Sequence, residues 1–146
     1  MSTGDLPVKA AEPALRAQMN PKCVVCGAEN AGGLRLQFRA CEPGVVEAQW
    51  TPSVEWEGFR GIVHGGVVST VLDEAMSKAI AGMHCEALTA ELRVRFHKPV
   101  NSGATLEVRG WVRRKAKRRV ETEATLLGPS GSMLAHAWAT FLELKR

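Results

Sequence analysis

Four stretches with strand character follow one another between residues 87 and 144, and only short turn segments separate them. They cover residues 87–97, 104–114, 118–127 and 133–144. Parallel strands need a crossover connection of about a dozen residues or more, so these strands are predicted to pair antiparallel. Leu92, Val94 and Phe96 alternate with polar residues, which is typical of a sheet with one packed face.

One long helix is predicted ahead of these strands, from about residue 65 to about residue 82. Its apolar residues recur at helical spacing and form a broad stripe: Val68, Val71, Leu72, Ala75, Met76, Ala79 and Ile80. Alternating residues also predict two strands joined by a turn, near residues 34–38 and 46–50. The predicted fold class is α+β, with one long central helix laid against a six-strand antiparallel sheet.

Length and composition favour one domain, since the chain has 146 residues of which 45% are apolar. Residues 1–20 lack sustained periodicity and are predicted to form a poorly ordered N-terminal arm, with at most one short helix near residues 14–19, ahead of a domain at residues 21–146. No stretch resembles a secretion signal or a membrane span, so a soluble cytoplasmic protein without a membrane partner is expected. The four cysteines are irregularly spaced and suggest no disulfide framework.

Positive charge is concentrated in one run. The formal net charge is +4, and six Lys and Arg residues lie between positions 113 and 119, so the rest of the chain is slightly acidic. The run is predicted to be the solvated end of a β-hairpin, and a contact to a phosphorylated ligand is the second interpretation. No nucleic-acid partner is expected, because the run has no reading motif and no interleaved aromatics; such binding would weaken steeply with salt.

The start of the predicted helix combines a histidine, two glycines and a carboxylate. His64 precedes Gly65 and Gly66, and Asp73 follows two turns later. First-turn N–H groups of a helix have no intrahelical partner, so Gly65 and Gly66 can stabilise an oxyanion. Small side chains around Asp73 leave room beside it, which makes it the first candidate for nucleophile or general base. Glu74 lies about 100° further around the helix and is the second candidate.

The spacing of these groups predicts a site shared between two chains. At about 1.5 Å per residue, Asp73 lies roughly 12 Å along the helix axis from Gly65, too far for both to touch one carbonyl group. If two copies of the helix pack antiparallel across a twofold axis, Asp73 of one chain meets the glycines of the other.

Three motifs accompany this element order: GIVHGGV at 61–67 with the acid nine residues after the histidine, FHKPV at 96–100, and CVVCG at 23–27 followed by Asn30 and Gly33-Leu34. Together they resemble the hotdog fold of acyl-coenzyme A thioesterases, in particular the phenylacetate-degradation type. This resemblance covers about residues 21–144. It implies hydrolysis of an acyl-coenzyme A, or a related thioester, to free acid and thiol without a metal or redox cofactor. It also implies a homodimer or a dimer of dimers with active sites at the subunit interface.

Candidate site residues follow from the resemblance and from charge. Asp73 matches the family's acid, and His64 matches its histidine, which either fixes the turn or contacts substrate. Thr70 and Gly58 are further candidate substrate contacts, although this chain has Glu57 and Gly58 where relatives often carry Gln or Asn. Candidate contacts for the coenzyme A phosphates are Arg95, Lys98, Arg113 and Arg118.

Cys23 and Cys26 have the spacing of metal ligands, but no second Cys or His pair follows, so no metal is expected. A tight turn that covers one end of the pocket is predicted there instead. Two alternative functions stay open: a non-catalytic acyl-coenzyme A sensor with the same fold, and a thioester hydratase or dehydratase.

Overall fold

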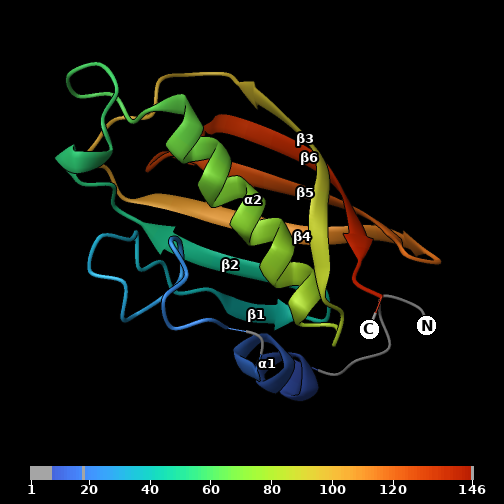
Figure 1. Cartoon of the computed structure of the whole chain (residues 1–146). Coiled ribbons are helices and arrows are strands. Elements are labelled where there is room, and N and C mark those ends of the chain that lie inside the picture. The colour runs from blue at the N-terminus through green and yellow to red at the C-terminus, as the bar shows by residue number, and fades with distance from the viewer. Residues whose placement is uncertain (1–7, 18, 146) are drawn as a thin grey trace.

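The computed structural model describes residues 8–17 and 19–145, which form one antiparallel sheet with a long helix across one face (Figure 1). The helices are α1 (Val8–Ala17), the 3-10 turn η1 (Val54–Trp56) and α2 (Gly65–Ala81). The strands are β1 (Arg39–Glu42), β2 (Val45–Trp50), β3 (Ala87–Phe96), β4 (Leu106–Ala116), β5 (Arg119–Leu127) and β6 (Met133–Glu143). Their order in the sheet is β1-β2-β4-β5-β6-β3, and all neighbours pair antiparallel. The predicted α+β architecture is confirmed.

The hydrophobic core lies between α2 and the sheet. Val71, Leu72 and Ala75 of α2 are fully buried there. The helix and the sheet come closest at Gly110 of β4, where an added Cβ would lie 2.6 Å from the carbonyl carbon and oxygen of Ala75. A glycine at this position allows the helix backbone to rest directly on the strand.

The first predicted strand begins later than its alternating pattern indicates. Leu36 is buried as expected, but residues 34–38 are not part of the sheet, and β1 starts at Arg39. Leu34 N–H and Leu36 N–H donate instead to the carbonyls of Val24 and Val25. The prediction is wrong here because this segment pairs with the turn around the two N-terminal cysteines, which periodicity alone does not reveal.

Helix α1 is a correction to the predicted poorly ordered arm. Residues 8–17 form a helix beside β1 (Figure 1), and Ala11, Ala14 and Leu15 are buried in the contact. Glu12 accepts a hydrogen bond from Ala40 N–H at 2.7 Å, which ties the helix to the edge of the sheet. So short a helix owes its stability to such tertiary contacts rather than to propensity, so the local sequence indicated only a short helix near residues 14–19. The rest of residues 1–20 lies partly outside the described residues.

Within the described residues, 8–17 and 19–145, no helix is both long and apolar enough to cross a lipid bilayer.

Candidate functional site

The histidine before α2 caps the helix. His64 Nδ1 accepts a hydrogen bond from Gly66 N–H at 2.9 Å, while Thr70 Oγ1 donates to the Gly66 carbonyl at 2.8 Å. Because Nδ1 accepts, the proton of a neutral imidazole lies on Nε2, which becomes a donor. The cap occupies Gly66 N–H, whereas Gly65, the first helical residue, has no intrahelical partner for its own N–H. Of the two glycines, Gly65 is therefore the better placed to bind an oxyanion.

A cavity of about 670 Å³ opens beside the start of α2. Its apolar walls come from the loop before α2, from α2 itself and from the end of β3 and the segment after it: Phe59, Ile62, Val63, Val68, Phe96 and Val100. His64, Gly65 and Lys98 also line it. Gly58 packs on the histidine, since a Cβ there would lie 3.2 Å from the imidazole Cδ2. The size and the apolar lining are those of a small-molecule site.

Asp73 lies two turns further along α2 and does not line this cavity. Thr89 Oγ1, on β3, donates a hydrogen bond to Asp73 Oδ1 at 2.7 Å. Burial raises the pKa of the Asp73 carboxyl above its usual value; the bond from Thr89 opposes this rise, and the charge of Glu74 adds to it. A carboxyl with a raised pKa is better matched to general-base chemistry near neutral pH. The sequence alone does not indicate Thr89, because tertiary packing decides which strand residue meets the helix.

Glu74, the second candidate acid, faces a different part of the molecule. Its Oε2 accepts a hydrogen bond from Cys23 Sγ at 3.2 Å and lies 3.9 Å from Lys78 Nζ. The two adjacent carboxylates of α2 therefore have separate surroundings, Asp73 beside β3 and Glu74 beside the N-terminal segment.

The Glu57 carboxylate accepts hydrogen bonds from residues near its own loop. Ser102 Oγ donates to Glu57 Oε2, and this bond, together with one from the Gly61 backbone, lowers the pKa of the Glu57 carboxyl. The Glu57 carboxylate therefore stabilises the conformation of the loop before the histidine.

The basic candidates are spread over two regions. Lys98 lines the cavity, and Arg95 is exposed on β3. Arg113 forms an ion pair of 3.2 Å with a glutamate of β5, and Arg118 donates to a carbonyl at the end of β6 at 3.0 Å. The structure brings Lys98 together with His64 and Gly65, whereas Arg113 pairs with β5 and Arg118 with the end of β6.

The sequence is similar to those of one family. The profile described as Thioesterase superfamily matches residues 60–132, which is half of the chain. A candidate esterase from Saccharolobus solfataricus is 29% identical over 110 residues, a match that covers 73% of this chain and 72% of that protein.

Solved structures share the fold. A thioesterase superfamily protein superposes with a TM-score of 0.80 at 25% identity over 84% of this chain, which spans 60% of that protein's length. A Streptococcus mutans UA159 protein bound to acetyl CoA has a TM-score of 0.72 at 18% identity, with 76% and 90% of the two chains covered. The E. coli PaaI protein from the phenylacetic acid degradation operon has a TM-score of 0.72 at 17% identity, with 77% and 81% covered. The helix-on-sheet architecture is thus a hotdog fold, and the chain belongs to the thioesterase superfamily.

Proposed function

We propose that this protein hydrolyses an acyl-coenzyme A or a related acyl thioester to a free acid and a thiol. Asp73 acts as nucleophile or general base, and the start of α2 in a second copy of the chain, at Gly65, binds the oxyanion. The observation that carries the proposal is the pair of features on α2: a partly buried carboxyl with a raised pKa, and a helix start that opens into an apolar cavity.

The chemistry needs no more than these groups. As a general base, Asp73 takes a proton from water while the water oxygen bonds to the thioester carbonyl carbon. Collapse of the tetrahedral intermediate breaks the C–S bond, and the leaving thiolate takes up a proton. As a nucleophile, Asp73 forms a mixed anhydride that water then hydrolyses. In either route the Gly65 N–H stabilises the oxyanion, a contribution of roughly 3 kcal/mol for one donor.

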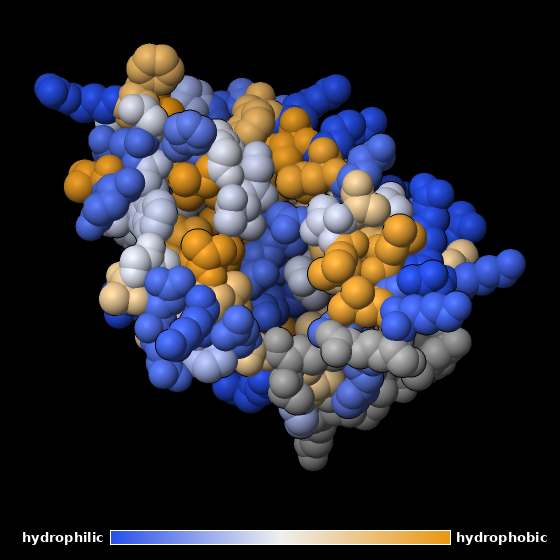
Figure 2. Space-filling view, viewed as in Figure 1, coloured by the Kyte–Doolittle hydropathy of each residue, from blue (hydrophilic) through white to orange (hydrophobic). Residues whose placement is uncertain are grey.

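A second copy of the chain is needed because the two groups lie apart on one helix. Eight residues separate Gly65 from Asp73, which corresponds to roughly 12 Å along the axis. Strand β3, which carries the partner of Asp73, lies at one edge of the sheet. Its Leu88 and Phe96 are 60% and 50% exposed, and Figure 2 shows apolar patches on the face that carries α2. A long edge strand with apolar side chains favours pairing with another copy.

Coenzyme A is the proposed thiol carrier. Lys98 at the cavity and Arg95 on β3 offer positive charge to its phosphates. The Streptococcus mutans protein of the same fold was solved with acetyl CoA, which supports the same ligand class here.

Thiol release tests the proposal. The full chain is incubated with acetyl-, medium-chain and aryl-coenzyme A, and the free thiol is followed with a chromogenic reagent. We expect turnover of at least one thioester by the wild type and a loss of about 10²–10⁴-fold in kcat for Asp73→Asn. Glu107→Gln, which removes an exposed acid on β4, is the matched control and retains wild-type activity.

Two results would change the assignment. Tight binding of acyl-coenzyme A without thiol release from any member of the panel would make the protein a sensor. Full activity in Asp73→Asn with loss in Glu74→Gln would move the catalytic role to Glu74.

A further inference from the structure

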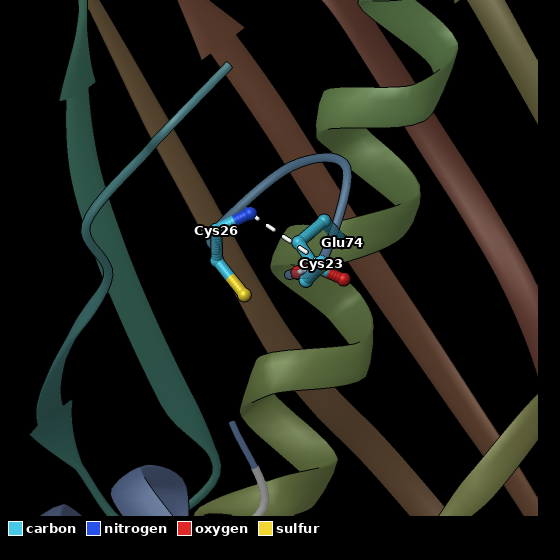
Figure 3. A group of neighbouring side chains, drawn as sticks. All are labelled: Cys23, Cys26 and Glu74. Carbon is cyan, nitrogen blue, oxygen red and sulfur yellow. Dashed lines mark hydrogen bonds between the residues drawn. The ribbon is translucent and has the colours of Figure 1, made fainter. Parts of the chain in front are cut away.

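Two cysteines of the N-terminal segment meet a glutamate of the central helix at a place separate from the cavity. Cys23, Cys26 and Glu74 each offer one potential ligand atom, and these three atoms lie within 4.8 Å of one another. Figure 3 shows the cysteine turn beside α2, with Cys23 overlapping Glu74 in this view, and Cys23 Sγ donates a hydrogen bond to Glu74 Oε2 at 3.2 Å. Cys23 to Glu74 spans 51 positions of sequence, so this grouping exists only in the folded chain.

The turn that carries the cysteines holds the sulfur of Cys23 in a fixed position. The backbone N–H groups of Val25 and Cys26 both point to Cys23 Sγ, at 3.4 and 3.5 Å. Gly27 closes the turn, because a Cβ there would lie 2.4 Å from the backbone nitrogen of Cys23. These two contacts and the bond to Glu74 fix the position of Cys23 Sγ between the turn and α2.

The charges around the cluster balance when a divalent cation is present. Lys78 Nζ lies 3.9 Å from Glu74 Oε2, and its side chain is only 8% exposed. Two thiolates and one carboxylate carry three negative charges, and a divalent cation with the buried ammonium carries three positive charges. A buried site without net charge avoids the large desolvation penalty of an unpaired ion.

The dimensions also fit a tetrahedral ion. With zinc–sulfur bonds of about 2.3 Å and zinc–oxygen bonds of about 2.0 Å, tetrahedral geometry puts sulfurs about 3.8 Å apart and sulfur and oxygen about 3.5 Å apart. Cys23 Sγ and Glu74 Oε2 are 3.2 Å apart, and no two of the three ligand atoms are more than 4.8 Å apart. The ligand atoms would therefore have to move by at most about 1 Å to reach tetrahedral distances. Cys23 is only partly buried, so water can supply the fourth ligand.

We propose that Cys23, Cys26 and Glu74 form a binding site for a thiophilic divalent cation such as Zn²⁺, with Lys78 as a charge-balancing neighbour. The ion joins the cysteine turn to α2 one residue away from Asp73. It thereby anchors the N-terminal segment to the helix that carries the proposed catalytic groups.

Metal uptake by the full chain tests the proposal independently of any enzymatic activity. The protein is reduced, stripped with a chelator and titrated with Zn²⁺ against a chromophoric competitor, then with Co²⁺ under the same reducing conditions. We expect one Zn²⁺ per chain and a thiolate-to-cobalt charge-transfer band in the near ultraviolet. Cys23→Ser and Cys26→Ser should each weaken binding by about 100-fold or more, while Cys41→Ser, which alters a cysteine outside the cluster, should bind as the wild type does.

The wild-type Co²⁺ spectrum keeps the test decisive if a cysteine variant fails to fold, because it reports sulfur ligation directly. A folded, reduced wild type that takes up Co²⁺ without this band, or takes up neither ion, would overturn the proposal. So would a Cys23–Cys26 disulfide in the purified protein, seen by mass spectrometry, if reduction restores no metal binding.

Discussion

At the scale of single residues, Asp73 and Thr89 form the unit on which the proposed chemistry depends. The hydroxyl of Thr89 holds one carboxylate oxygen of Asp73 in place, and the same bond limits how far burial raises the pKa of the acid. Thr89 thus acts as a positioning residue: it sets the orientation of Asp73 and the pH range in which the carboxylate is charged.

Removing this hydroxyl should shift the pH dependence of the reaction. In Thr89→Val the carboxylate loses a donor that favours its charged form, so the pKa of Asp73 rises further. In the proposed reaction the charged form is the active one, so the acid limb of the kcat/KM profile should move to higher pH. The rate at the plateau should change less than in Asp73→Asn.

The measurement is a pH–rate profile for wild type and variant. Thr105→Val is the matched control, because Thr105 bonds another threonine, Thr51, and does not contact Asp73. An acid limb that stays in place or moves to lower pH in Thr89→Val would contradict the role given to Thr89.

At the scale of secondary-structure elements, the fold depends on how closely α2 approaches β4. A side chain at position 110 would overlap the backbone of Ala75, and helix backbone cannot move aside as the end of a long side chain can. The absence of a side chain at Gly110 therefore determines the distance between the helix and the sheet, and with it the position of Asp73 relative to β3.

Gly110→Ala should destabilise the fold by about 1–3 kcal/mol, the usual effect of overpacking a dense core. Alanine is otherwise at least as suitable in a strand as glycine, so the sign of the change reports the clash with Ala75. Urea unfolding measures the effect, and Gly32→Ala is the control, because its Cβ would meet only the Asn30 side chain, at 3.7 Å. Equal stability of Gly110→Ala and wild type would show that α2 can move away from the sheet without loss.

At the scale of the whole molecule, the proposed site requires two chains. In the proposed site one chain would contribute the helix start at Gly65, and the other would contribute Asp73 beside the edge strand β3. Because the relation is symmetric, each dimer would contain two such sites, and each site would combine groups from both chains.

Combining two inactive variants should therefore restore activity. Gly65→Ala places a methyl group beside the proposed oxyanion donor, and the fold accommodates it, since its nearest contact is Phe96 at 3.6 Å. Asp73→Asn removes the acid. A heterodimer of the two, co-expressed with different tags and purified by tandem affinity, contains one intact site of two and should show about half of the wild-type activity.

Each variant homodimer alone should be at least about 100-fold less active than the wild type. A heterodimer as inactive as its parents would place Asp73 and Gly65 of one chain in the same site. Sedimentation is the companion measurement, and a fully active monomer would likewise contradict the shared site.

Local periodicity was sufficient for most of the fold. Helix α2 and strands β3 to β6 were predictable because each is long enough for its own repeat of apolar residues to appear in the sequence. Segment 34–38 was not, and only a short helix near residues 14–19 was predicted where α1 lies. The reason is that α1 is held by β1, and Leu34 and Leu36 bond to the cysteine turn. In both places tertiary contacts outweighed local preference.

The features of the candidate site also fall into two groups, those that local sequence determines and those that tertiary packing determines. The sequence alone determined that a histidine and two glycines open a helix and that an acid follows two turns later, because these residues are close in the chain and the pitch of a helix is constant. Only the tertiary structure decided that the histidine caps Gly66 rather than Gly65, that Thr89 bonds to Asp73, and that Glu74 meets Cys23. The last two contacts depend on how the N-terminal turn and the edge strand pack around α2, and that packing is set by the core as a whole rather than by local sequence.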